Sequence, residues 1–281
     1  MKLKSMLRPE KLILLLFSAI WAIVALFPLY MVINILFSSR SDAVFVNFQL
    51  LPSSLSAGIS SIKTVLSDTQ FVSGTLVSFL YGVLQSIGML LIASMAAYEF
   101  ALFEFQGKRV LFLIALISMM VPAAVTIVPA FRVVVELKWM NTMQGLVIPG
   151  LASASGLFIL TQFMETLPKE LLQSASIDGA SHFKQYTKIV LPLSKSSMLT
   201  AGLLCFLGAW GNLLWPLVVT TAQELQPISL VVQKYSSAFS TLYPLNVQLA
   251  AMFLACIPPV ALYIFFQRFI MEGIATSGLK G

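Results

Sequence analysis

Long runs without a charged residue dominate the hydrophobic pattern of this chain. Six of these charge-free windows are 22 residues or longer: Leu12–Ser39, Thr69–Tyr98, Val110–Phe131, Trp139–Met164, Ser196–Gln223 and Tyr235–Gln267. About 20 residues, at 1.5 Å of helix rise each, are enough to cross the hydrocarbon core of a bilayer. The pattern therefore predicts an all-α polytopic membrane protein with six transmembrane helices.

A seventh charge-free stretch, Ala43–Ile62, differs from the six windows because it is rich in polar side chains. It contains Asn47, Gln49, Pro52 and five serines, which are typical of turns because they compete with helix hydrogen bonding. We predict a loop outside the bilayer for this stretch.

The first window follows a basic start, as the apolar core of a cleaved signal peptide would. Its apolar run is far longer than the roughly 7–15 residues of a signal core, and no small-residue cleavage site follows it. We therefore expect a retained first transmembrane helix.

Composition supports a membrane location. Of the 281 residues, 58% are hydrophobic and 10% are charged, and the mean hydropathy is +0.92, whereas a soluble domain carries about 25% charged residues. The net charge of +6 would also suit nucleic-acid binding, but the basic residues are scattered between apolar segments and form no stripe. Cys205 and Cys256 lie far apart inside apolar segments, which indicates small buried side chains rather than a disulfide or a metal site.

The 17 basic residues divide unevenly between the two sides that six spans would create. Twelve lie on the side of both termini: Lys2, Lys4, Arg8, Lys11, Lys108, Arg109, Lys169, Lys184, Lys188, Lys195, Arg268 and Lys280. Five lie on the other side: Arg40, Lys63, Arg132, Lys138 and Lys234. Because positively charged loops favour the cytoplasm, we expect a plasma (inner) membrane protein with both termini inside.

One cytoplasmic loop, residues 165–195, is long enough to form a structure of its own. Pro168 suits the first turn of a short helix, where its missing N–H costs nothing. That helix would run to Asp178, and Gly179 would end it in the left-handed conformation.

A second short helix is predicted directly after this glycine. Ser181 would cap it, and Phe183, Tyr186 and Val190 would share one of its faces at spacings of three and four. Leu191-Pro192 would stop it, because a residue before proline avoids the α region. Such a helix pair is either an amphipathic connector at the membrane surface or a docking element for a groove on a soluble partner.

The loop sequence resembles a known motif. LLQSASIDGA, with LPL a short distance on, is similar to the EAA loop of importer permeases in the ATP-binding-cassette (ABC) superfamily. The resemblance implies coupling to an ATPase through Gln173, Ser174, Ala175, Asp178, Gly179, Ala180, Ile189, Leu191 and Pro192. Two positions depart from the family pattern. Gln173 replaces a glutamate and Ser174 replaces an alanine, so an ion pair to the ATPase is lost while docking itself is still expected.

Flanking segments resemble the carbohydrate-uptake branch of these permeases: Tyr98–Arg109, Asn141–Phe163, Phe206–Val219 and Gln267–Gly281. The resemblance covers roughly Thr69 to the C-terminus, and the first helix matches in kind only. It implies the type I importer transmembrane fold. Residues 1–68 would form an N-terminal segment, the first helix and an outside loop, residues 69–270 the transmembrane domain, and residues 271–281 a cytoplasmic tail.

The resemblance also implies partners for a chain of this kind. An ABC ATPase dimer would bind ATP and Mg, a second homologous permease subunit would complete the path, and an extracytoplasmic solute-binding protein would deliver the solute. That solute would be an oligosaccharide, a glycoside, a polyol or a glycerol-phosphate ester. No nucleic acid is expected among the partners.

Catalytic chemistry is not indicated by the residues themselves. The sequence has no G-x-x-x-x-G-K-[ST] loop that would cradle a phosphate. Its single histidine, His182, lies in the docking loop, and one histidine with two separated cysteines is too few ligands for a metal site. We expect a permease with no catalytic residue, ATP site or metal of its own.

Polar and aromatic residues inside the windows are candidates for the solute path, because polar groups are costly to expose to lipid. The candidates are Gln85, Thr126, Gln162, Trp210, Asn212 and Trp215. Aromatic rings can stack on the C–H face of a sugar while amides bond its hydroxyls. For each residue the alternative is helix packing or an interfacial aromatic belt.

An ion-coupled secondary transporter is the alternative function. Such transporters usually need carboxylates inside the membrane or discontinuous helices in paired repeats. All six windows lack Asp and Glu, and no internal repeat is visible. The sequence therefore favours transport driven by a separate ATPase.

Overall fold

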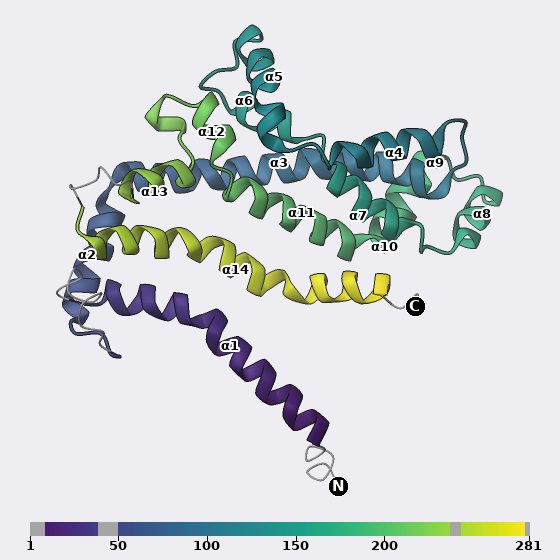
Figure 1. The fold of residues 1–281 in the computed structure, drawn as a ribbon. Helices are drawn as coiled ribbons and strands as arrows, with labels where there is room; N and C mark the ends of the chain where they lie inside the picture. Colours follow the sequence, from purple (N-terminus) through teal and green to yellow (C-terminus); the bar gives the residue numbers. More distant parts are fainter. Residues whose placement is uncertain (1–8, 39–49, 237–242, 279–281) are drawn as a thin grey trace. The chain divides into compact units, whose positions relative to one another are not determined.

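The computed structural model describes residues 9–38, 50–236 and 243–278, and every regular element in these ranges is a helix (Figure 1). In chain order the elements are α1 (Pro9–Leu36), α2 (Leu55–Ser67), α3 (Thr69–Leu102), α4 (Lys108–Ser118), α5 (Ala123–Glu136), α6 (Met143–Val147), η2 (Ile148–Gly150), α7 (Ala154–Met164), α8 (Lys169–Ile177), α9 (His182–Gln185), η3 (Tyr186–Val190), α10 (Leu191–Leu193), α11 (Lys195–Trp210), α12 (Leu214–Val219), η4 (Gln223–Leu225), α13 (Ile228–Ser236) and α14 (Leu245–Gly278). The predicted all-α class is confirmed for these ranges. Lys2, Lys4, Arg8, Arg40, Lys280 and part of the predicted outside loop, residues 43–49, lie outside them.

The chain divides into two compact units, residues 1–68 with 234–255, and residues 69–233 with 256–281. In the first unit, the ring of Phe37 occupies the space beside Gly58, where an added Cβ would come within 2.0 Å of it. Tyr235 donates a hydrogen bond to the Asp68 carboxylate at 2.5 Å. Burial, assisted by this bond, raises the pKa of Tyr235.

The loop prediction for Ala43–Ile62 is wrong in its second half, because α2 begins at Leu55. Ser54 is the N-cap of this helix, and its Oγ accepts the N–H of Ala57 at 3.3 Å. Ser61 donates to the carbonyl of Ala57 at 2.9 Å, so its hydroxyl is satisfied inside the helix. The serines that suggested a loop therefore start the helix and fit within it.

In the second unit α3 is the central helix, and α7 and α11 pack along it. Small side chains such as Ala93, Ala97 and Ala201 are buried between these helices, as expected where membrane helices approach closely. Gly82 lies against the ring of Phe206, which is 2.6 Å from where a Cβ would be, so a larger side chain there would push α11 away.

Three helices are long and apolar enough to cross a membrane unbroken: Leu12–Leu36, Thr69–Leu102 and Leu245–Phe269. The other candidates are bent pairs: α4 with α5 at 98°, α6 and η2 with α7 at 46°, and His182–Leu193 with α11 at 78°. The described residues thus hold three unbroken spans, or up to six if each bent pair is one span. Several predicted windows are therefore not single helices.

Local chemistry explains these breaks. Pro122 has no N–H and pushes the preceding residue out of the α region, so α4 ends at Ser118 and α5 begins at Ala123. Ser153 accepts the N–H of Gly156 at 3.1 Å and so starts α7 anew. The fifth window, Ser196–Gln223, is divided between α11 and α12, and in the sixth α14 begins only at Leu245.

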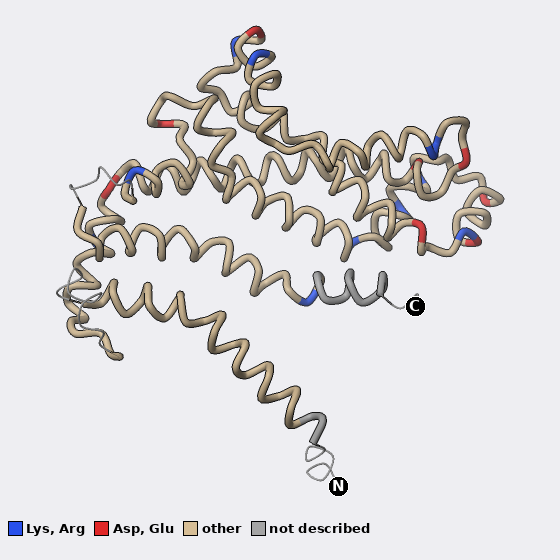
Figure 2. Tube along the Cα trace, in the orientation of Figure 1, with Lys and Arg blue, Asp and Glu red and all other residues tan. Residues whose placement is uncertain are grey.

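Charged residues of the second unit gather at the ends of its helices, and the middle of α3 and α11 is free of them (Figure 2). One group lies at α5, where Arg132 and Glu136 form an ion pair at 2.9 Å. Another surrounds the α3–α4 turn and α8–α10, and includes the pair Lys108–Glu104 at 3.0 Å. An apolar middle with charged ends is what a helix needs in order to lie in a bilayer.

Candidate functional site

The loop of residues 165–195 begins with α8, and the predicted stop after this helix is confirmed. Gly179 has φ +74°, and the N–H of Ala180 donates to the carbonyl of Ala175 at 2.9 Å. The N–H of Gly179 itself donates to the carbonyl of Ser176 at 3.1 Å. These two bonds form a Schellman motif, which needs a left-handed residue that glycine supplies without strain. Three of the nine predicted coupling residues therefore build the end of α8.

The second helix starts where predicted but does not stop at Leu191-Pro192. Ser181 is its N-cap and accepts the N–H of Lys184 at 3.4 Å. The helix continues through η3, a π-helix in which the N–H of Leu191 donates five residues back to Tyr186, and then through α10 to Leu193. A wider π turn just before a proline relieves the clash that its ring would make in a regular α-helix. The chain then bends by 78° into α11.

A buried glutamine connects the two helices of the loop. Gln185 is 3% exposed, and its Nε2 donates to the Oγ of Ser176 at 3.0 Å and to the carbonyl of Ala180 at 2.9 Å. Both acceptors belong to α8 or its cap, whereas Gln185 ends α9. This side chain therefore fixes the angle between the helices. Sequence reasoning missed it, because a glutamine in a cytoplasmic loop is ordinarily a surface residue.

The second helix is also anchored to α3. The hydroxyls of Tyr186 and Ser94 are hydrogen-bonded at 2.7 Å, and Tyr98 donates to the carbonyl of His182 at 3.2 Å. The rings of Tyr98 and Tyr186 lie 5.3 Å apart, and the ring of His182 lies 5.0 Å from that of Phe103. A displacement of this helix must therefore move α3. Ser94 and Tyr98 were not predicted, although Tyr98 begins the first flanking segment of the resemblance.

The nine predicted coupling residues face outward to different degrees. Exposed are Gln173, Ser174, Asp178, Gly179 and Pro192, and half-buried are Ala175, Ala180, Ile189 and Leu191.

Two large apolar side chains stand among these polar residues. Ile177 is 87% exposed and Phe183 is 70% exposed. On the predicted shared face the rings of Phe183 and Tyr186 lie 6.4 Å apart, but only Tyr186 and Val190 are buried there. Exposed apolar side chains on a charged surface are typical of a protein-binding site.

The candidates for the solute path in the fifth window make hydrogen bonds within the chain. Trp215 is buried and donates from Nε1 to the carbonyl of Gly145 at 3.0 Å. Asn212 donates to the hydroxyl of Tyr81 at 3.4 Å and accepts the N–H of Trp215 at 3.3 Å. Trp210 is buried, and its ring stacks on that of Phe206 at 5.8 Å. These contacts favour the packing alternative for the three residues.

The other three candidates make contacts of their own, and Gln85 lies one helical turn after Tyr81 on α3. Gln85 is half-buried and packs against Gly150, where an added Cβ would lie 2.5 Å from its Nε2. Thr126 is exposed and bonds the carbonyl of Ala123 in its own helix. Gln162 is exposed and donates to Glu165 at 3.2 Å. The six candidates therefore do not form one site within the described part of the chain.

A comparison with protein families gives a match that includes the loop. Residues 88–275 match the model of the family described as binding-protein-dependent transport system inner membrane component. The chain belongs to this family. The matched region contains both helices of the loop and the two α3 residues, Ser94 and Tyr98, that are hydrogen-bonded to the second helix.

Curated members of this permease family resemble the chain along most of its length. An sn-glycerol-3-phosphate transport system permease protein, UgpE, of Salmonella typhi is 32% identical over 261 residues, which is 90% of this chain and 92% of that protein. An arabinooligosaccharides transport system permease protein, AraQ, of Halalkalibacterium halodurans is 32% identical over 192 residues, 68% of each chain.

The permease fold is also found in a solved structure. A chain in the crystal structure of a bacterial ABC transporter involved in the import of the acidic polysaccharide alginate matches with a TM-score of 0.80. The match covers 92% of this chain and 95% of that chain at 22% identity. At this identity the likeness establishes a common fold.

Replacing Trp215 with phenylalanine separates packing from solute binding. The permease would lose the bond from Nε1 to the Gly145 carbonyl, and we expect it to unfold more easily by about 1–3 kcal/mol because that buried acceptor is left without its donor. The measurement is the thermal midpoint in detergent together with the KM for uptake. A lowered midpoint with unchanged KM is expected, whereas a raised KM at unchanged midpoint would assign Trp215 to the solute path.

Proposed function

We propose that this chain is the permease subunit of an ABC importer that moves a sugar or a sugar-like solute across the plasma (inner) membrane. ATP hydrolysis would take place on a separate ABC ATPase dimer that binds ATP and Mg, and this chain would have no ATP site of its own. The observation that carries the proposal is a stiff helix pair, α8 with α9–α10, in a chain of the binding-protein-dependent permease family.

The helix pair would act as the coupling element. The exposed residues Gln173, Ser174 and Asp178, with the apolar side chains of Ile177 and Phe183, would enter a groove of the ATPase. The cap at Gly179 and the side chain of Gln185 would keep the pair rigid, and the Tyr186–Ser94 bond would pass its displacement to α3. The bundle would then alternate between inward-open and outward-open states.

The proposed topology has six spans, with each bent pair crossing the bilayer once and both termini in the cytoplasm. It is supported by the lengths of the helices and by the excess of basic residues on the predicted inner side. The transmembrane domain would occupy residues 69–270 with the coupling loop at 165–195. A second homologous permease subunit and an extracytoplasmic solute-binding protein would complete the assembly.

The solute class is proposed from the relatives, whose names refer to arabinooligosaccharides and to sn-glycerol-3-phosphate. A phosphate ester would require free cations on the outer side of the path. Arg132, one of five basic residues on the predicted outer side, already pairs with Glu136. This pairing takes up one of the few basic residues near the outer span ends, and their small number supports the proposal of a neutral sugar.

Purification and vesicle uptake test the proposal against the alternative, an ion-coupled secondary transporter. The chain should co-purify with an ATPase from the membrane. Uptake into vesicles that contain the assembly should need ATP and the solute-binding protein, and it should persist when ionophores remove ion gradients. Uptake that follows an ion gradient without any nucleotide would overturn the proposal.

The substitution Gln173→Glu tests the alignment of the coupling residues. The new carboxylate would restore the family's charge on an exposed position of α8, so we expect ATPase association to be kept or strengthened. An exposed ion pair contributes up to about 1 kcal/mol, which corresponds to an affinity gain of up to roughly fivefold. The readout is the Kd of the ATPase for the permease in detergent. Loss of association would show that Gln173 does not face the partner.

A further inference from the structure

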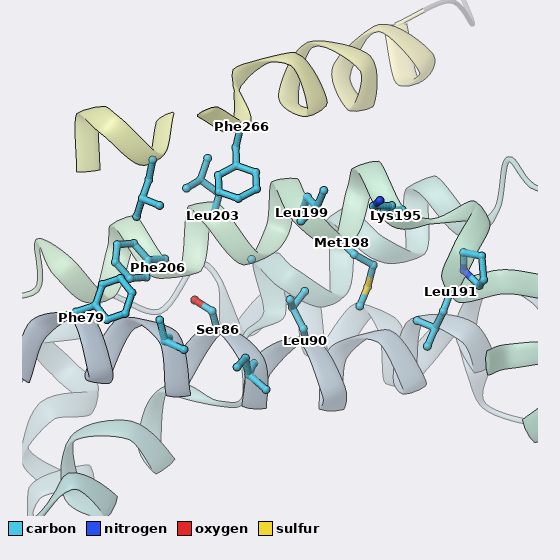
Figure 3. A pocket seen from close by; sticks show the side chains of 15 residues that line it. Phe79, Ser86, Leu90, Leu191, Lys195, Met198, Leu199, Leu203, Phe206 and Phe266 are labelled. Carbon is cyan, nitrogen blue, oxygen red and sulfur yellow. The ribbon is translucent and has the colours of Figure 1, made fainter. Parts of the chain in front are cut away.

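An apolar cavity of about 480 Å³ lies in the second unit between α3, α11 and the C-terminal half of α14 (Figure 3). Phe79 and Phe206 line one end, Leu90 and Met198 the middle, and Lys195 the other end. Ser86 is the polar residue in the middle of its wall and is itself buried. None of the six candidates for the solute path is among the lining residues. A wall of this composition suits a hydrocarbon chain and offers a sugar almost no hydrogen bonds.

The length of the cavity matches one leaflet of a bilayer. From Phe79 to Leu90 along α3, and from Lys195 to Phe206 along α11, the helix rise amounts to about 16 Å at 1.5 Å per residue. Half of a hydrocarbon core roughly 30 Å thick is about 15 Å. A single acyl chain of one leaflet would therefore extend from the charged end of the cavity to its aromatic end.

The charged end carries one cation. Lys195 is exposed at the start of α11, where the charge-free window begins. Within the described part of the chain it forms no ion pair.

We propose that this cavity binds one acyl chain of an anionic phospholipid, whose phosphate lies against Lys195. Basic residues between transmembrane helices at the membrane surface attract acidic headgroups, whereas a zwitterionic headgroup gains little there. With the topology proposed above, the lipid belongs to the cytoplasmic leaflet. It would sit beside the junction of the coupling helix with α11, since Leu191 and Pro192 also line the cavity. The lipid would thereby hold α14 against α3 and α11.

Native mass spectrometry of the purified assembly tests this site. The intact complex would be titrated with dioleoylphosphatidylglycerol or dioleoylphosphatidylcholine, and retained lipids would be counted. We expect about fivefold tighter retention of the phosphatidylglycerol, the amount expected for one cation near the headgroup. Lys195→Gln should remove this preference. Lys188→Gln, an exposed lysine in η3 that does not line the cavity, is the matched control and should keep it.

A second variant tests the acyl chain rather than the headgroup. Leu199→Trp would fill the cavity and should lower retention of both lipids, and a thermal midpoint measured in parallel shows whether the fold is kept. Equal retention of the two lipids by the wild type, or a preference that survives Lys195→Gln, would overturn the proposal. It would also fail if Leu199→Cys formed a disulfide with a cysteine of the second permease subunit, because a partner helix would then occupy the cavity.

Discussion

Replacing Gly179 with valine is expected to abolish solute uptake while the amount of chain in the membrane stays unchanged. Gly179 holds φ at +74°, and nothing lies within 4 Å of the Cβ that a substitution would add. The expected damage is therefore backbone strain, about 1–2 kcal/mol for a residue with a side chain. The strain would open the cap between Ala175 and Ala180, so α8 would lose its fixed angle to α9. ATP-driven uptake into vesicles and an immunoblot of the membrane fraction measure the two quantities.

Two controls isolate the backbone conformation at this glycine. Gly179→Asn should retain most of the uptake, because asparagine tolerates the left-handed region. Gly107→Val is the matched control outside the loop, since Gly107 has φ +84° and also has no atom within 4 Å of an added Cβ. We expect this variant to keep ATPase association. Normal uptake by Gly179→Val would contradict the rigid coupling element.

The helix pair was predictable because short-range rules determine its main features. A left-handed glycine and a serine N-cap are read from two residues, Gly179 and Ser181, and both predictions are confirmed. The same local reasoning failed at Pro192, since the widened turn of η3 depends on bonds that reach five residues back. The roles of Gln185 and Ser94 involve partners on other helices, and no spacing rule reveals those.

The membrane windows show a similar division. Hydropathy predicted where apolar segments lie, because charge alone delimits them. It did not predict the bends, because a proline such as Pro122 inside a long apolar window is compatible with either a kinked helix or a broken one. The sequence also could not decide whether a polar residue in a window contacts the solute or packs against a neighbouring helix. Asn212 illustrates this, as its amide is used by Tyr81 and by the start of α12.

The contacts around the coupling loop suggest why its second helix is the more firmly attached of the two. Tyr186 and Val190 are buried against the core that also holds Ala97 and Met164 of α3 and α7. No residue of α8 is buried, so that helix depends on its cap and on Gln185 for its position. Force from a partner would therefore enter at α8 and leave through α9 and η3. The connection between them is the weakest point of the route.

Replacing Gln185 with leucine tests this connection and is expected to uncouple ATP hydrolysis from transport. Leucine fills nearly the same buried volume as glutamine, but it removes the donor to Ser176 and to the Ala180 carbonyl. The two lost hydrogen bonds contribute about 0.5–1.5 kcal/mol each, so the angle between the helices would be held roughly tenfold less tightly. We expect the assembled complex to keep hydrolysing ATP while the solute moved per ATP falls by about tenfold. Both rates are measured on the same proteoliposomes.

The matched control is Gln144→Leu, because Gln144 is an exposed glutamine in α6 and lies outside the loop. Its stoichiometry of transport should equal that of the wild type. A thermal midpoint near the wild-type value for Gln185→Leu would show that the effect is local to the loop and that the bundle remains folded. If Gln185→Leu transported solute with unchanged stoichiometry per ATP, the angle between α8 and α9 would not matter for coupling. In that case α8 and α9 would transmit motion as independent helices.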